Sequence, residues 1–214
     1  MSAKHFNLTD ITNQNTPDSW YQLRLFNYFR ISLALFFITL HINGWLYKLI
    51  PADFTNTRLF LVTSVIYLVA SLLISISLYF QKPDIRFQVI IHTLLDISCL
   101  IILMHAAGGI RTGLGMLLII SVSMSSLFVQ KQTTILFAAI ATLGIISEQF
   151  YSQLIYTNYQ PAFTQAGLLG ILIFISAFLT VYTARRIRES EKLAEETSYE
   201  LETIVQMNEH IIKS

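Results

Sequence analysis

The residues of this chain whose type and spacing suggest chemistry are a carboxylate in an apolar run and a histidine one helical turn before it. Asp96 lies in the run Ile-Ile-His-Thr-Leu-Leu-Asp-Ile-Ser-Cys-Leu, and His92 precedes it by four residues. In a helix this spacing puts both side chains on one face. An ionisable group in hydrocarbon is unfavourable unless it is paired or neutralised, and a His–Asp hydrogen bond would lower the cost. The pair could sense protons, bind a polar group of a ligand, or simply lock two helices together.

A second carboxylate, Glu148, stands between Ser147 and Gln149 near the end of another apolar run. It either lies inside a helical bundle or reaches the polar interface of a membrane. We count it with Asp96 and His92 among the candidate residues for sensing a ligand.

A glycine cluster follows the run that contains Asp96. A phosphate-binding loop would need a preceding strand and, in its Walker form, a Lys-Ser or Lys-Thr ending, and the sequence has neither. The cluster therefore predicts a tight turn between two helices. Arg111 within it could meet an anionic headgroup or a partner, or could be a plain loop charge. The candidate residues here are Gly108, Gly109, Arg111 and Gly113.

The sequence predicts no catalytic residue, no metal site and no cofactor of its own. His41, His105 and Cys99 do not have the spacing of metal ligands, and histidines near span ends are usually interfacial. Cys99 is the single cysteine, so no disulfide can form within the chain. His210 is not followed by the acidic residue, with a nearby arginine and proline, that is expected at a phosphoacceptor histidine, and no asparagine-rich or glycine-rich ATP-lid motif is present.

The composition indicates that the bilayer is the solvent for these residues. Hydrophobic residues make up 54% of the chain and charged residues 13%, with a mean hydropathy of +0.57, whereas soluble domains carry about 25% charged residues. The apolar residues occur in blocks close to the roughly 20 residues that cross a bilayer. We predict an all-α membrane protein with six transmembrane helices, at residues 28–48, 58–80, 87–106, 113–129, 133–154 and 164–183.

The distribution of basic residues predicts that both termini are cytoplasmic in a bacterial inner membrane. Positive charge is enriched on the cytoplasmic side of membrane proteins. Six crossings place eleven basic residues inside and three outside. The inner residues are Lys4, Arg24, Arg30, Lys82, Arg86, Lys131, Arg185, Arg186, Arg188, Lys192 and Lys213; the outer ones are Lys48, Arg58 and Arg111. A net charge of +1 argues against nucleic acid as a partner.

The chain divides into three parts. Residues 1–25 are expected to be an uncleaved cytoplasmic tail, residues 26–183 a six-span sensor domain, and residues 184–214 a cytoplasmic helical arm. Pairs of small residues four apart, such as Ala166 with Gly170, Ser71 with Ser75, and Gly109 with Gly113, allow close approach of membrane helices.

The arm contains neither glycine nor proline, so the last span can continue as one helix for roughly 45 Å beyond the membrane. One heptad register puts polar residues in the seam near the membrane and apolar residues farther away, and a buried asparagine at position a commonly fixes a parallel pair. We therefore expect a homodimeric coiled coil, with a surface amphipathic helix or part of a following domain as the alternatives. The seam has Ile187, Ala194, Leu201 and Asn208 at position a, and Ser190, Thr197, Ile204 and Ile211 at position d.

Two stretches resemble the membrane portion of PilS-type sensor histidine kinases, which work with a response regulator that controls type IV pilus genes. The first runs from His92-Thr-Leu-Leu-Asp96 through Ala106-Ala-Gly-Gly to Thr112-Gly-Leu-Gly-Met-Leu-Leu, and resembles the third and fourth spans of the family. The second is Ala184-Arg-Arg-Ile-Arg-Glu-Ser-Glu with Met207-Asn-Glu-His-Ile-Ile, and is similar to its exit helix.

The resemblance implies a sensor module that monitors pilin subunits in the membrane and passes the signal through the last helix. Its kinase domain, with ATP and Mg, and its response regulator would act through parts not in this chain. The residues leave open another output domain on the same sensor, a small transporter or channel, and a membrane scaffold.

Overall fold

The computed structural model describes residues 17–44, 56–80, 85–156 and 160–213, and these form helices joined by turns. The structure consists of α1 (Pro17–Ile42), α3 (Thr57–Phe80), α4 (Ile85–Ala106), a short 3-10 helix η3 (Ile110–Thr112), α5 (Met116–Ser125), α6 (Lys131–Ile155) and α7 (Phe163–Lys213).

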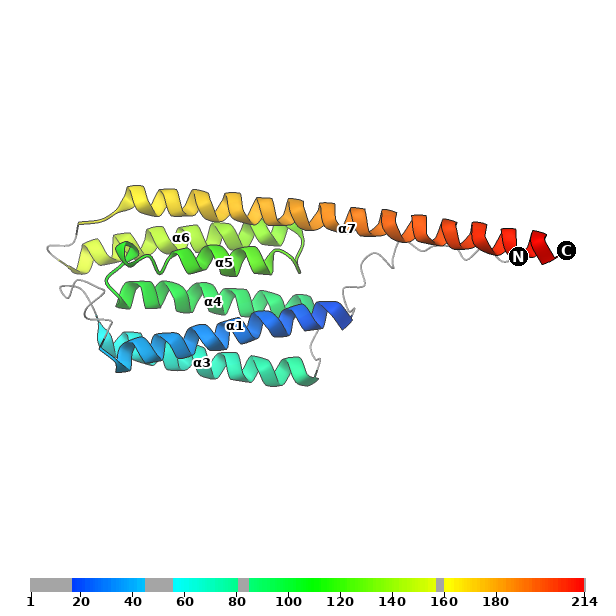
Figure 1. The fold of residues 1–214 in the computed structure, drawn as a ribbon. Coiled ribbons are helices and arrows are strands. Elements are labelled where there is room, and N and C mark those ends of the chain that lie inside the picture. The colour runs from blue at the N-terminus through cyan, green and yellow to red at the C-terminus, as the bar shows by residue number, and fades with distance from the viewer. Residues whose placement is uncertain (1–16, 45–55, 81–84, 157–159, 214) are drawn as a thin grey trace.

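The helices pack side by side around α4 (Figure 1). α4 contacts α3 on one side and α5 and α6 on the other, whereas α1 packs mainly on α3, and α7 packs on α5 and α6. The first residue of α1 and the extension of α7 lie at the same end of the bundle, which we call the arm end. The glycine-rich turn lies at the opposite end. This arrangement fits an even number of crossings.

Five of the described helices are long and apolar enough to cross a membrane, and α5 is a shorter apolar helix. Ten helical residues rise only about 15 Å, but hydrogen-bonded turns extend this segment at both ends. Leu117 N–H donates to Leu114 O, and Phe128 N–H donates to Ser125 O. The expected span at 113–129 is thus present as a short helix between tight turns.

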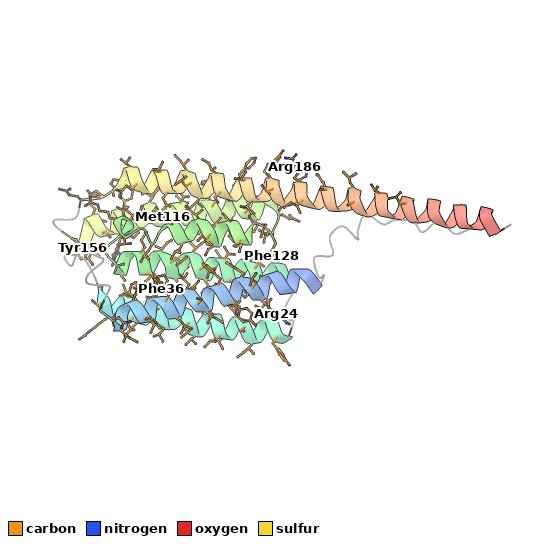
Figure 2. All side chains as sticks on the ribbon, in the orientation of Figure 1. Arg24, Phe36, Met116, Phe128, Tyr156 and Arg186 are labelled. Carbon is orange, nitrogen blue, oxygen red and sulfur yellow. The ribbon has the colours of Figure 1, made fainter. Side chains whose placement is uncertain are left out.

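The bundle has an apolar interior and an apolar exterior, which is typical of helices surrounded by lipid. Leu103, Met104 and Leu118 are fully buried at the centre. Phe36 and Met116, labelled in Figure 2, are more than half exposed and face outward.

The first helix begins earlier than the sequence suggested. The expected tail of residues 1–25 and the expected span at 28–48 are both shifted, because α1 starts at Pro17 and its apolar stretch covers Leu23–Ile42. Proline suits the first helical position, where its missing N–H costs nothing. Leu23 is buried with Ile74 and Leu78 of α3, and this packing stabilises a segment that reads as polar. Residues 45–50 lie outside the described ranges.

Close approach of helices occurs at one of the expected small-residue pairs. A Cβ added to Gly170 would lie 2.5 Å from Thr142 Cγ2, and Ala166 is fully buried. The pair on α7 therefore lies against α6. Gly109 and Gly113, in contrast, lie in the turn with φ of 93° and 76° rather than in a helix contact.

α7 is one helix of 51 residues that leaves the bundle at the arm end, as the absence of glycine and proline from the arm predicted. Its length is about 76 Å. Ile187 and Leu201, two of the predicted seam residues, are 52% and 59% exposed on the arm. The side chains of Ile204, Asn208 and Ile211 lie outside the described set.

Candidate functional site

An ion pair lies in the middle of the bundle. Arg30 Nη2 of α1 is 2.5 Å from Asp96 Oδ1 of α4, and the two side chains are 1% and 0% exposed. The Tyr67 hydroxyl of α3 donates a hydrogen bond of 3.0 Å to the same oxygen. We call Arg30, Tyr67 and Asp96 the charge triad. It connects three helices through one carboxylate.

The elements place this triad well inside the hydrocarbon. Asp96 is the twelfth of the 22 residues of α4, and Arg30 is seven residues from Leu23, where the apolar part of α1 begins. Seven residues correspond to about 10 Å along a helix. Charged groups at such depth are rare and face a partner or a water-filled cavity. Because α1 otherwise packs on α3, the ion pair is its main described connection to α4.

His92 is not the partner that the i,i+4 spacing suggested. The Asp96 carboxylate meets Arg30 and Tyr67, while His92 contributes its backbone oxygen, 3.4 Å from Arg30 Nη2. Its side chain is buried in the same region. A guanidinium carries a permanent charge and five donors, so it neutralises a carboxylate better than an imidazole does.

The sequence places Arg30 among the inner topological charges, whereas the structure places it in the charge triad. The sequence did contain a signal. An intramembrane carboxylate requires a partner, and Arg30 is a basic residue that lies inside an apolar run. The guanidinium also lies 5.7 Å from the ring centroid of Tyr67 and 6.0 Å from that of Phe26, which favours its burial.

A second polar cluster lies near the opposite end of the bundle, between α4 and α6. His105 Nδ1 is 3.1 Å from Glu148 Oε1, and Ser152 Oγ donates to the same carboxylate oxygen at 2.8 Å. Gln149 Nε2 donates to Glu148 Oε2, and Gln149 Oε1 accepts the Ala162 N–H just before α7. The cluster therefore joins α4, α6 and the start of α7.

These contacts settle two open points about burial. The Glu148 side chain is 3% exposed, so it lies inside the bundle rather than at the interface. His105, which the sequence predicts to be an interfacial histidine, is its partner.

The cluster contains the residue types of a Ser-His-acid catalytic triad but not its geometry. Ser152 Oγ is 3.2 Å from His105 Nδ1, the same ring nitrogen that contacts the Glu148 carboxylate. A Ser-His-acid catalytic triad needs them on different nitrogens, so the cluster is not a hydrolytic site.

Replacing His105 by alanine should destabilise the bundle by about 1–3 kcal/mol, because Glu148 would keep its burial and lose one bonding partner. The free energy of unfolding in detergent micelles measures this. His41→Ala is the matched control, since His41 Nδ1 is buried without a hydrogen bond to any described residue. Equal losses for the two variants would show that the His105–Glu148 contact contributes nothing.

The glycine cluster forms the predicted tight turn. Gly108, Gly109 and Gly113 have positive φ, a region that glycine enters without a steric penalty. Arg111 Nη2 donates to the backbone oxygen of Gln160 at 3.3 Å, so this charge bridges two neighbouring connections of the same chain. The turn and the charge triad are at different depths and do not form one site.

The remaining features of the bundle are an apolar groove and isolated titratable side chains. In the described part of the chain no three His, Cys, Asp or Glu side chains gather as metal ligands. An apolar groove of about 470 Å³ lies between α6 and α7 towards the arm end. It is lined by Lys131, Thr134, Ile135, Ala138, Phe174, Ile175, Ala177, Phe178, Leu179 and Val181.

A bundle of apolar helices with a buried charge triad and a long helical arm defines a multi-pass membrane domain whose last helix continues beyond the bundle. Residues 12–194 match the model of a protein family described as the PilS-like transmembrane domain, a six-span domain. The chain therefore belongs to this family, which confirms the resemblance and the predicted fold class.

The sensor protein kinase PilS of Pseudomonas aeruginosa is 29% identical to this chain over 195 residues. The aligned region covers 89% of this chain and 35% of that relative, so the chain spans about a third of the length of the kinase. No solved structure matches.

Proposed function

We propose that this chain is the membrane sensor module of a two-component histidine kinase that regulates type IV pilus expression. Membership of the PilS-like family and similarity to a sensor protein kinase support the sensor role. The observation that carries the proposal is α7, a single helix that starts inside the bundle and extends far beyond it. An unbroken helix can convey a displacement in the membrane to a domain attached to its far end.

The sensor sits in the bacterial inner membrane with both termini in the cytoplasm. The arm end carries Arg24, Lys131, Arg185 and Arg186, and the opposite end carries Arg58 and Arg111. Arg30 is buried inside the bundle and is therefore left out of the count of basic residues on the two sides. Across the sequence this leaves ten basic residues on the inner side and three on the outer side. This bias still favours the arm end as the cytoplasmic side.

The ligand is a pilin subunit bound within the membrane. An apolar helix can lie against the groove between α6 and α7, where it would touch the output helix directly. Such a ligand changes the output only if it prefers one arrangement of the bundle, and a shift from mostly off to mostly on needs about 5.5 kcal/mol of differential binding. The charge triad connects α1 to α4, and its contacts could differ between the two arrangements of the bundle.

A fusion tests this function. The chain is joined through Ser214 to the kinase region of the Pseudomonas relative, and autophosphorylation is measured in vesicles with and without co-inserted pilin. We expect pilin to change the rate, and Ile135→Trp, which places a larger side chain at an exposed position of the groove, to abolish the change while leaving basal phosphorylation intact. An unrelated membrane helix is the control. A fusion whose autophosphorylation rate is the same with and without pilin would contradict the proposed ligand.

ATP, Mg²⁺ and the response regulator act on domains outside this chain. The transporter alternative loses its main support, because Asp96 has a fixed partner in Arg30 and Glu148 has one in His105. A different output domain attached to the same arm remains compatible with the geometry, and the sequence that follows Ser214 in the gene distinguishes it.

The sensor acts as a parallel dimer through the arm. In a parallel coiled coil the a positions of the two helices face each other, so cysteines at Leu201 should reach disulfide geometry, with Cα atoms about 4.4–6.8 Å apart. In a Cys99→Ala background, Leu201→Cys should form a crosslinked dimer on mild oxidation. Glu189→Cys is the control, because it is equally exposed but lies at position c, away from the seam. Equal crosslinking at both positions would contradict the register.

A further inference from the structure

Two stripes of polar side chains face each other between α1 and α3, from the arm end to the charge triad. They consist of Arg24, Asn27 and Arg30 on α1 and of Tyr67, Ser71 and Ser75 on α3. Spacings of three and four residues return side chains to one face of a helix. Asn27 Nδ2 donates to the Ser71 backbone oxygen at 3.3 Å, which places the two stripes in contact.

The stripes begin at a pocket on the arm end of the bundle. The pocket has a volume of about 130 Å³ and lies between residues 24–28 of α1 and the last turns of α3. Its lining is half polar. A water molecule occupies about 30 Å³ in the liquid, so the pocket has room for several. Asn27 lines it, and Arg30 lies one turn deeper on the same helix.

Buried polar atoms continue from this pocket to the triad. Asn27 Oδ1, Arg30 Nε, Arg30 Nη1 and Asp96 Oδ2 make no hydrogen bond of ordinary geometry to a described residue, although Ser121 of α5 interacts with the Asp96 carboxylate, and the three side chains are at least 98% buried. Buried polar atoms without a protein partner usually bind ordered water. The set combines acceptors on Asn27 and Asp96 with donors on Arg30 between them, and water can bridge such a series because it both donates and accepts.

The other side of the triad is closed. Ala34, Phe37 and Phe60 are fully buried there, and the two phenylalanine rings meet edge to face with centroids 5.8 Å apart. Ser64, also fully buried on this side, donates to the Phe60 backbone oxygen of its own helix. A water molecule would find apolar side chains and satisfied polar groups along this part of the α1–α3 contact.

We propose that a file of water enters between α1 and α3 from the arm end and stops at Arg30 and Asp96. The polar stripes, the pocket and the unsatisfied buried atoms mark its path, and the phenylalanine contact seals it. Water at the triad lowers the cost of separating Arg30 from Asp96, because each charge would then meet water rather than hydrocarbon. The inference goes beyond the proposed sensor role and does not depend on it.

The test compares two serines of α3 that differ mainly in their side of the triad. Ser71 and Ser64 are both fully buried, and each donates to the backbone oxygen four residues earlier. Single Ser71→Cys and Ser64→Cys variants in a Cys99→Ala background are treated with a small cationic methanethiosulfonate in sealed vesicles of known orientation. An added cysteine at Leu193 on the exposed arm identifies the accessible side.

We expect Ser71→Cys to react at least about tenfold faster than Ser64→Cys, and from the arm side alone, because the reactive thiolate forms far more readily beside water than in an apolar core. Adding Asn27→Leu, which removes the polar link to the pocket, should reduce the Ser71→Cys rate to that of Ser64→Cys. If Ser71→Cys does not fold, Ser75→Cys one turn nearer the arm end serves in its place. Equal rates at both serines, or labelling from the opposite side, would overturn the proposal.

Discussion

Replacing Asp96 by leucine is expected to destabilise the bundle by about 3–5 kcal/mol, the usual cost of breaking a buried ion pair. Arg30 would keep its burial and lose its only anionic partner among the described residues. A guanidinium cannot give up its proton in a protein, so the charge would stay. The free energy of unfolding, from reversible denaturation in mixed micelles, measures the loss.

The opposite single substitution should cost less. Arg30→Met leaves Asp96 unpaired, but a carboxyl group can take up a proton and become neutral, so we expect about 1–3 kcal/mol. The double variant Arg30→Met with Asp96→Leu should be more stable than Asp96→Leu alone, because no charge remains buried.

Matched controls separate this effect from general changes of hydrophobicity. Arg24→Met on the same helix and Ser98→Leu on α4 alter exposed positions, and such changes usually stay within about 0.5 kcal/mol. Equal losses for Asp96→Leu and Arg30→Met, or a double variant as unstable as Asp96→Leu, would show that the pair is not what holds α1 to α4.

Much of the fold could be predicted because hydropathy and helix breakers act locally. Apolar blocks of membrane length located the helices, and the absence of glycine and proline from residues 184–214 predicted that the last span continues into the arm. The shortness of α5 was not predictable from hydropathy. Ser125 Oγ donates to Val122 O and Ser126 Oγ to Ser123 O, and such side-chain bonds compete with the helical ladder at the end of the segment.

The site was predicted only in part, because its contacts join distant segments. The apolar surroundings of Asp96 identify it in the sequence, but spacing rules relate residues within one helix and therefore predict His92 as its partner. The true partner is Arg30, 66 positions earlier in the chain. His105 and Glu148 are 43 positions apart, and likewise meet only when α4 packs on α6.

The two buried polar contacts lie on opposite sides of α4. α4 stands between α1 and α3 on one side and α5, α6 and α7 on the other. The charge triad joins α4 to the first group, and the His105–Glu148 cluster joins it to the second and to the start of α7. α4 therefore carries a buried polar contact to each group of helices, and the second contact reaches the residue that precedes α7.

Inserting two alanines after Ser190 is expected to abolish the response of the fused kinase to its membrane signal. Alanine keeps the arm helical, but two residues turn everything beyond the insertion by about 200° at 3.6 residues per turn. The seam residues from Ala194 onward would then face away from the partner helix. The response is lost because a rigid arm transmits the signal only in its original rotational phase. Autophosphorylation with and without pilin measures the response.

An insertion of seven alanines at the same place is the matched control. It lengthens the arm more than the two-residue insertion does, but it restores the seam to within about 20° of its original direction. We therefore expect it to keep most of the response. A kinase that responds after both insertions would mean that α7 is a tether rather than a rod, whereas one that fails after both would mean that the length of the arm matters more than its phase. Retention with seven alanines and loss with two is the pattern that requires a rigid helix from the bilayer to the output domain.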